Sequence, residues 1–225
     1  MGRMSFGEAV FLLITARRAT PQEALLLDAV LVSLIEHGLT PSAVVSRVTY
    51  SLVPESIQGA VAAGLLGVGG VVLGSMEDCG RLLTRIGKER EGGVTLDDAT
   101  RRIVEEYRAA HKRVPGVGHA LHTDGDPRAE RLLAIAEECR KSGAHVEALR
   151  ELTHQNEVAA GRRMPINVTG AVAAVLLELD VPWQLHRGFA LVSRTAGLVA
   201  HISEEMDEPL TPAFSAFIRS GTDDE

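Results

Sequence analysis

The sequence contains 225 residues, with 23 Lys+Arg against 30 Asp+Glu and a formal net charge of -7. This acidic balance gives no electrostatic reason to bind a polyanion, so we expect no nucleic-acid partner. The length allows one large domain with a substantial core. The two cysteines, Cys79 and Cys139, lie in helix-like stretches without metal-ligand spacing, which predicts buried thiols and no metal site.

Two apolar runs bear on where in the cell the protein is expected. The first, residues 9–14, is short and is soon followed by Arg17 and Arg18, which argues against a signal peptide. The second, residues 59–74, carries no charge but falls short of the roughly 20 residues that span a bilayer. We therefore expect a cytoplasmic protein without a membrane segment. The second run predicts a buried helix that breaks near residues 67–70. A helix that is apolar on every face needs neighbours all round it, in a large core or at a subunit contact, which favours a dimer.

Helix-start signals recur along the chain. Ser5 with Glu8, and Thr20 with Glu23, have capping-box spacing, in which a hydroxyl and a carboxylate each satisfy a free backbone N–H. Further starts of this general kind are Thr40-Pro41, Pro54-Glu55, Thr95 and Asp126-Pro127.

No segment has the pattern of a convincing strand, so the predicted fold is all-α. We expect a single helical domain over residues 1–225. A smaller helical lobe at about residues 115–195 is a possible addition, and residues 219–225 form a polar acidic tail.

The most informative stretch is residues 114–128, which read VPGVGHALHTDGDPR. Gly116 and Gly118 would let the backbone approach a ligand closely, and His119 follows them with a titratable imidazole. An Asp-Pro helix start places Arg128 in the first turn of the next helix. The histidine and the arginine can therefore converge on one anionic ligand. Spacing alone also fits a simple turn with a surface histidine, and by itself favours that interpretation.

The same stretch resembles a loop of the citrate synthase family, which reads Pro-Gly-x-Gly-His, a short spacer and Asp-Pro-Arg. The spacing from His119 to Arg128 is the same. Further similarities follow in order along most of the chain, at residues 5–23, at residues 36–39 and in the helix around Arg194. In length the sequence is closest to the shorter, citryl-CoA lyase-like members.

The resemblance implies a citrate synthase-like helical fold, a homodimer, and coenzyme A thioesters as ligands, with a 2-oxo acid or hydroxy acid as the other reactant. His119 would be the acid or base at the oxygen of the product hydroxyl. His37 would bind the oxo acid, while Arg128 and Arg194 would hold its carboxylates through their planar guanidinium groups. The backbone groups implied to meet the adenine end of coenzyme A belong to Pro115, Gly116, Val117 and Gly118.

Three positions depart from the family pattern. The second catalytic histidine is replaced by Gly70 or Val72, depending on the alignment gap. The aspartate base at the acyl α-carbon falls on Thr169, whose hydroxyl is a poor base. Glu208 stands where a partner-subunit arginine is usual. Ordinary citrate synthesis is therefore not expected.

These departures favour a citryl-CoA lyase-like enzyme, which cleaves a 3-hydroxyacyl-CoA into an acyl-CoA and a 2-oxo acid. Such cleavage begins with removal of a hydroxyl proton, which His119 can accept without a base at Thr169. The departing enolate must still be stabilised and protonated, and either solvent or Thr169 would serve as the catalytic group for this step. The alternative is a catalytically lapsed relative that binds coenzyme A or a dicarboxylate as a sensor or partner subunit. A helical dimer without a small-molecule role would leave the match around His119 unexplained.

Single residues also have simpler interpretations. His37, near a helix end, can interact with the helix dipole. A buried Arg194 needs an anionic partner, for which a ligand is suitable. The remaining histidines that we expect on the surface or in satisfied packing, because no pair has metal-site spacing with other donors, are His122, His154, His186 and His201.

Overall fold

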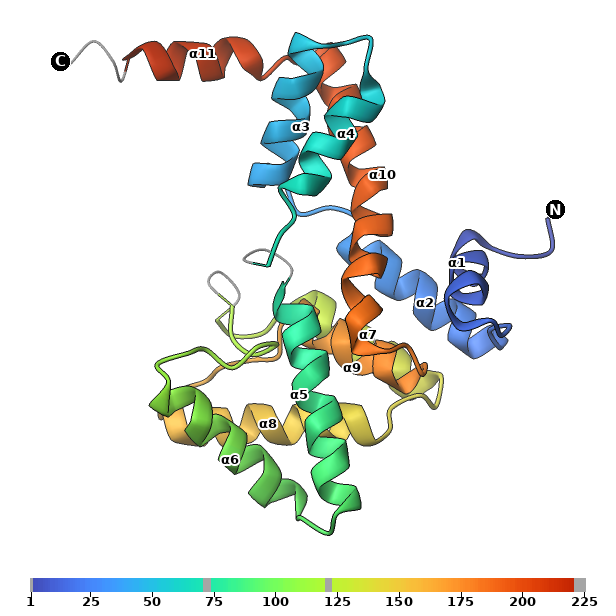
Figure 1. Ribbon diagram of the computed structural model, residues 1–225, viewed down its shortest axis with the longest axis vertical. Helices are drawn as coiled ribbons and strands as arrows, with labels where there is room; N and C mark the ends of the chain where they lie inside the picture. Colours follow the sequence, from blue (N-terminus) through green and yellow to red (C-terminus); the bar gives the residue numbers. More distant parts are fainter. Residues whose placement is uncertain (1, 71–73, 120–122, 221–225) are drawn as a thin grey trace. The chain divides into compact units, whose positions relative to one another are not determined.

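The computed structural model describes residues 2–70, 74–119 and 123–220 (Figure 1). Over these residues the predicted all-α fold is confirmed, and the only extended pairing is an isolated antiparallel bridge between Val117 and Ile166. The helices are α1 (Phe6–Thr15), α2 (Pro21–Leu34), α3 (Pro41–Leu52), α4 (Ile57–Leu66), α5 (Gly74–Glu91), α6 (Leu96–Ala109), α7 (Pro127–Glu138), α8 (Ala144–Ala160), α9 (Val168–Glu178), the 3-10 helix η1 (Trp183–Leu185), α10 (His186–Asp207) and α11 (Thr211–Ser220).

The chain divides into two compact units. Unit 1 comprises Met1–Ser33 and Gly70–Phe189, and unit 2 comprises Leu34–Gly69 and Ala190–Glu225. Most of the lobe expected at about residues 115–195 belongs to unit 1. Unit 2 instead contains α3, α4, the later part of α10, and α11.

The C-terminal segment is helical further than its composition suggested. The polar tail expected at residues 219–225 begins inside α11, which continues to Ser220. Residues 221–225 lie outside the described residues.

Helix α9 forms the centre of unit 1. Its sequence, VTGAVAAVLLE, is apolar on nearly every face, and a helix of this kind needs neighbours all round. It contacts α5, α7 and α8, and the residues from Ala171 to Leu176 are buried without exception. The helices that hold α9 in place therefore also fix its first turn, which carries Thr169.

Within one chain, the helix expected in residues 59–74 is not buried on every face. The helix does break at Gly67, but Leu66 is 87% exposed and only Ala60 and Gly64 of α4 are buried. Those small residues allow close packing within unit 2: a Cβ on Gly64 would lie 2.9 Å from the carbonyl oxygen of Ser42. Apolar composition did not distinguish this small-residue face, which packs, from the opposite face, which is exposed.

The helix starts expected from capping signals are largely confirmed. Ser5 and Glu8 form the reciprocal capping box of α1. At α2, the Thr20 N–H donates to Glu23 at 2.9 Å and the Glu23 N–H donates to the Thr20 hydroxyl at 3.3 Å. Helices also begin at the expected Pro41, Leu96 and Pro127, whereas α4 begins at Ile57, after the expected Pro54-Glu55.

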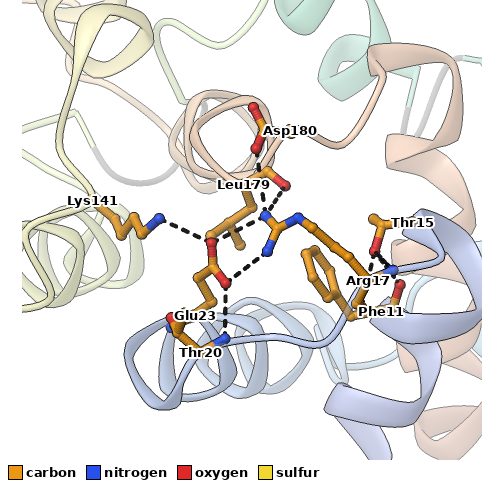
Figure 2. Close-up of polar contacts among 8 residues, drawn as sticks. All are labelled: Phe11, Thr15, Arg17, Thr20, Glu23, Lys141, Leu179 and Asp180. Carbon is orange, nitrogen blue, oxygen red and sulfur yellow. Dashed lines mark hydrogen bonds and ion pairs between the residues drawn. The ribbon is translucent and has the colours of Figure 1, made fainter.

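The carboxylate of Glu23 also joins distant parts of unit 1 (Figure 2). Arg17 donates to it at 2.8 Å and Lys141, from the connection between α7 and α8, donates at 2.9 Å. Arg17 also donates to the carbonyl oxygen of Leu179, just after α9. The hydrogen bond from Arg17 outweighs the effect of burial and lowers the pKa of Glu23 to about 2. The cluster ties the connection between α1 and α2 to the end of α9.

Candidate functional site

The loop that precedes His119 is fixed by backbone hydrogen bonds to the segment before α9. The Gly118 N–H donates to the Pro165 carbonyl at 2.7 Å, and the Asn167 N–H donates to the Gly116 carbonyl at 3.1 Å. The Asn167 side chain adds a bond to the Gly118 carbonyl at 2.8 Å. Gly116 and Gly118 have φ values of 82° and 79°, in the left-handed region that favours glycine.

A cavity of about 330 Å³ adjoins this loop in unit 1. Its lining includes His119 and the guanidinium-bearing side chains Arg113, Arg162 and Arg163. Within the described part of the chain, none of these arginines has a carboxylate partner. Permanently charged guanidinium groups bind phosphate and carboxylate well, so the cavity suits an anionic ligand beside an imidazole that can transfer a proton.

Asp126 does more than cap α7. It is fully buried, and it accepts hydrogen bonds from the backbone N–H of Arg128 at 3.1 Å and from that of Val168 at 3.0 Å. The Arg128 guanidinium pairs with the same carboxylate at 3.0 Å. Burial acts against ionisation, but these hydrogen bonds prevail and lower the pKa of Asp126. Asp126 therefore joins the starts of α7 and α9, a role that the sequence did not indicate.

Thr169 is part of a short chain of hydrogen bonds. Its hydroxyl donates to the Asn167 side-chain oxygen at 2.7 Å, and that oxygen also accepts from the Gly170 N–H at 3.0 Å. The Ser75 hydroxyl lies 3.0 Å from that of Thr169. Because an amide oxygen only accepts, Thr169 uses its one proton on Asn167, and Ser75 must donate to Thr169. Ser75 was not predicted from the sequence, because the pattern around it has no family signal.

The two remaining predicted residues belong to unit 2. Helix α2 ends at Leu34, so His37 lies in the connection between α2 and α3, where it is exposed. Arg194 is 7% exposed and lies on α10. A Cβ on Gly197 would lie 3.2 Å from Glu36 Oε2, so α10 approaches this connection closely. The structure thus assigns His37 and Arg194 to one unit, and the other predicted site residues to unit 1.

Residues 2–217 match the family model of the citrate synthase C-terminal domain. The chain belongs to the citrate synthase family. The family resemblance predicted from residues 114–128 is therefore confirmed.

Curated citrate synthases from two bacteria illustrate the relationship. The citrate synthase of Synechocystis sp. is 27% identical over 210 residues, covering 91% of this chain and 50% of that protein. Citrate synthase 2 of Bacillus subtilis is 26% identical over 195 residues, covering 86% and 50%. The chain spans about half the length of the curated relatives it matches.

Two solved structures of enzymes show the same fold. The citryl-CoA lyase of Hydrogenobacter thermophilus has a TM-score of 0.83 and 34% identity, covering 92% of this chain and 78% of that one. ATP citrate lyase of Methanothrix soehngenii, in complex with citrate and coenzyme A, has a TM-score of 0.77 and 19% identity, covering 91% and 34%. The second likeness shows the fold alone.

The departures from the citrate synthase family pattern have different settings in the structure. Gly70 lies just before the start of α5, and Val72 lies outside the described residues. Glu208 is exposed between α10 and α11, and its backbone carbonyl accepts a hydrogen bond from Arg47 at 2.6 Å. Its side chain is not part of any described ion pair.

The histidines and cysteines outside the motif are placed largely as expected. Cys79 and Cys139 are buried and unpaired with each other, and burial raises the pKa of the Cys79 thiol to about 12. His154 is exposed, and His122 lies outside the described residues. His186 is buried and shares a hydrogen bond with the Val181 carbonyl.

Among the residues that the structure describes, no group of three or more His, Cys, Asp or Glu side chains could hold a metal ion. No helix formed by the described residues is both long and apolar enough to cross a membrane.

Proposed function

We propose that the protein is a coenzyme A-thioester lyase of citryl-CoA type, which cleaves a 3-hydroxyacyl-CoA into an acyl-CoA and a 2-oxo acid. The observation that carries this proposal is the cavity in which His119 lies beside Arg113, Arg162 and Arg163. It combines a proton-transfer group with positive charge for a phosphate-bearing thioester. The similarity to a citryl-CoA lyase over 92% of the chain supports the same reaction class.

In the proposed reaction, His119 accepts the proton of the substrate hydroxyl. The bond between the hydroxyl-bearing carbon and the acyl α-carbon then breaks, and its electron pair passes to the acyl-CoA as an enolate. The hydroxyl carbon becomes the carbonyl of the 2-oxo acid, the enolate takes a proton at the α-carbon from solvent, and His119 releases its proton to solvent. His37 would bind the oxo acid, and Arg128 and Arg194 would hold its carboxylates.

The hydrogen bonding of Thr169 supports cleavage over synthesis. Synthesis needs a base that removes a proton from the acyl α-carbon, and a hydroxyl that donates to Asn167 is not such a base. Cleavage needs no base at this position. The backbone from Pro115 to Gly118, fixed against Pro165 and Asn167, would meet the adenine end of coenzyme A.

The neutral Thr169 also favours a second candidate, a relative that binds coenzyme A or a dicarboxylate without catalysis. In either case we propose a homodimer. Unit 2 exposes large apolar side chains that a second copy could cover, notably Leu52 at 72%, Leu66 at 87% and Phe217 at 75% exposure. Sedimentation equilibrium would show a monomer at all concentrations if the dimer proposal is wrong.

The function is tested by offering the purified protein citryl-CoA and other 3-hydroxyacyl-CoAs, with the released 2-oxo acid measured in a coupled assay. Calorimetry with coenzyme A is run in parallel. Turnover establishes the lyase, and binding without turnover establishes the second candidate. A folded protein that neither binds nor turns over would exclude both.

A matched set of variants locates the ligand. Arg162→Gln combined with Arg163→Gln should weaken coenzyme A binding roughly a hundredfold, because two charge-assisted contacts of about 1.5 kcal/mol each are removed. Arg101→Gln is the control, since Arg101 is an exposed arginine on α6 paired with Asp97 and Asp98. Equal affinities in the two variants would place the ligand elsewhere.

A further inference from the structure

His201, on α10 in unit 2, lies between two carboxylates. Its side chain is only 6% exposed. Nδ1 lies 2.9 Å from Glu204, and Nε2 lies 3.0 Å from Glu36. A carboxylate can only accept, whereas a neutral imidazole has a single N–H to give. Both hydrogen bonds are therefore made together only when the ring carries both protons.

The chain of charges continues beyond Glu204. The Glu204 oxygen that faces His201 also accepts from Arg47, on α3, at 3.2 Å. Arg47 in turn donates to Glu205 at 2.7 Å. Negative and positive groups thus alternate from the connection before α3 to the core of unit 2. The charged groups around His201 are Glu36 before α3, Glu204 and Glu205 on α10, and Arg47 on α3.

Glu205, the buried end of this row of charged side chains, fixes the start of α11. The Glu205 side chain is 1% exposed. It accepts hydrogen bonds from the Ser51 hydroxyl, from the Leu210 N–H at 2.8 Å and from the Thr211 hydroxyl at 3.2 Å. Burial disfavours the ionised form, but these bonds together with Arg47 lower the pKa of Glu205 to about 2. The Glu205 carboxylate therefore stays ionised and continues to hold the start of α11.

Glu36, the exposed end of this row of charged side chains, holds the backbone of His37. Glu36 Oε1 accepts the N–H of His37 at 2.7 Å and also the N–H of Gly38, whose φ is 71°. The same carboxylate is held by His201. The orientation of the connection that carries His37 therefore depends on Glu36, and that of Glu36 depends on the proton of His201.

We propose that Glu36 and His201 are positioning residues for His37, and that protonation of His201 sets the affinity of unit 2 for the 2-oxo acid. Loss of one imidazole proton breaks the bond to one of the two carboxylates and leaves Glu36 or Glu204 facing a lone pair. When the bond to Glu36 is the one lost, the connection carrying His37 loses this hydrogen bond to α10. The ligand in this inference rests on the proposed function, but the protonation state and its effect on the His37 backbone do not.

The first test needs no ligand. Nitrogen NMR of the imidazoles should show both ring nitrogens of His201 protonated while the two hydrogen bonds are formed, and loss of a ring proton should speed amide exchange at His37 and Gly38 beyond the general acceleration of exchange by base. His201→Gln should show the faster exchange wherever the native ring carries both protons, because both N–H groups of its amide lie on one nitrogen and cannot reach carboxylates on opposite sides of the ring. A His201 ring that carries a single proton at every pH at which the protein is folded, or exchange at these amides that is unchanged in the variant, would overturn the proposal.

The second test uses oxaloacetate as the probe. For the native protein, its affinity should fall over the pH range in which the NMR spectrum shows the His201 ring losing a proton. Where the native His201 ring carries both protons, His201→Gln should weaken oxaloacetate binding about tenfold, because a charge-assisted hydrogen bond is lost. At higher pH, where the native ring has lost a proton, the affinities of the variant and the native protein should become equal. Coenzyme A affinity should stay unchanged.

Matched variants separate positioning from folding. Glu36→Gln keeps an acceptor for the His37 N–H but loses the charge held by His201, so it should reproduce the loss of pH dependence without unfolding the protein. His154→Gln, at an exposed position of unit 1, is the control and should leave the pH profile as native. Parallel pH profiles in native protein, Glu36→Gln and His201→Gln would refute the inference. If oxaloacetate does not bind to any form, the proposed ligand is wrong, and the NMR test still decides the inference about His201.

Discussion

Gly116 and Gly170 lie backbone to backbone. A Cβ added to either residue would come within 2.9 Å of the Cα of the other, a separation that real Cβ atoms do not tolerate. Gly116 belongs to the loop before His119, and Gly170 to the first turn of α9. The pair therefore sets how closely the loop approaches the helix that carries Thr169.

Gly170→Ala should destabilise the protein by about 1–3 kcal/mol or more, because the added methyl group overpacks a rigid backbone contact. Coenzyme A binding should weaken as well. Gly188→Ala is the control: it lies in α10 with no heavy atom within 4 Å, and alanine there should stabilise the helix by roughly 0.5–1 kcal/mol. Urea unfolding measures both. Equal midpoints for the two variants would contradict the close contact.

Glu23 should make stability depend on acidity. Its pKa falls from 4.5 to about 2 on folding, so the stabilisation is complete above the unfolded value and is lost as the pH falls from about 4.5 towards 2. Glu23→Gln should lower stability at neutral pH by on the order of 3 kcal/mol, since Arg17 and Lys141 lose their buried partner. The free energy of unfolding of the variant should also vary less over this acidic range. An unchanged slope against pH would show that Glu23 is not the responsible group.

His119→Ala should lower the turnover of citryl-CoA by roughly 10²- to 10⁴-fold, the usual contribution of a positioned acid or base. His154→Ala, which removes an exposed imidazole from α8, should leave it near native. Steady-state kinetics and circular dichroism of both variants check this. Small and equal effects would remove His119 from the reaction.

Thr169→Asp tests whether the protein lacks only a base at the acyl α-carbon or also the stabilisation of the enolate. A carboxylate there could remove a proton from an acyl α-carbon, and the Ser75 hydroxyl 3.0 Å away would favour its ionised form. The variant should therefore exchange deuterium into the methyl group of acetyl-CoA faster than the native protein, with no carbon-carbon bond made. A folded variant that binds acetyl-CoA without extra exchange would mean that this position is not at the reacting carbon.

The features that could be predicted from the sequence are local. The capping box of Ser5 and Glu8 depends on residues three apart, and so does the start of α2. The motif from Pro115 to Arg128 gave the family because its glycines, histidine and helix start occur in a fixed order. Each of these signals is complete within a short stretch of chain.

The features that were missed depend on segments brought together by folding. The bond from Val168 to Asp126 spans 42 positions, and that between Ser75 and Thr169 spans 94. No spacing in the sequence marks such a pair. The hydropathy pattern of α4 does not separate the face that packs within the chain from the face that does not, because small and large apolar residues count alike although only the small ones pack closely.

The burial of α9 has a consequence for local opening of unit 1. A helix enclosed by α5, α7 and α8 cannot lose its hydrogen bonds without separating its neighbours, so its amide protons should exchange only through the largest unfolding event of that unit. Proteases should likewise cut unit 1 elsewhere first. A fragment ending inside α9 should therefore appear only after the rest of the unit has been degraded.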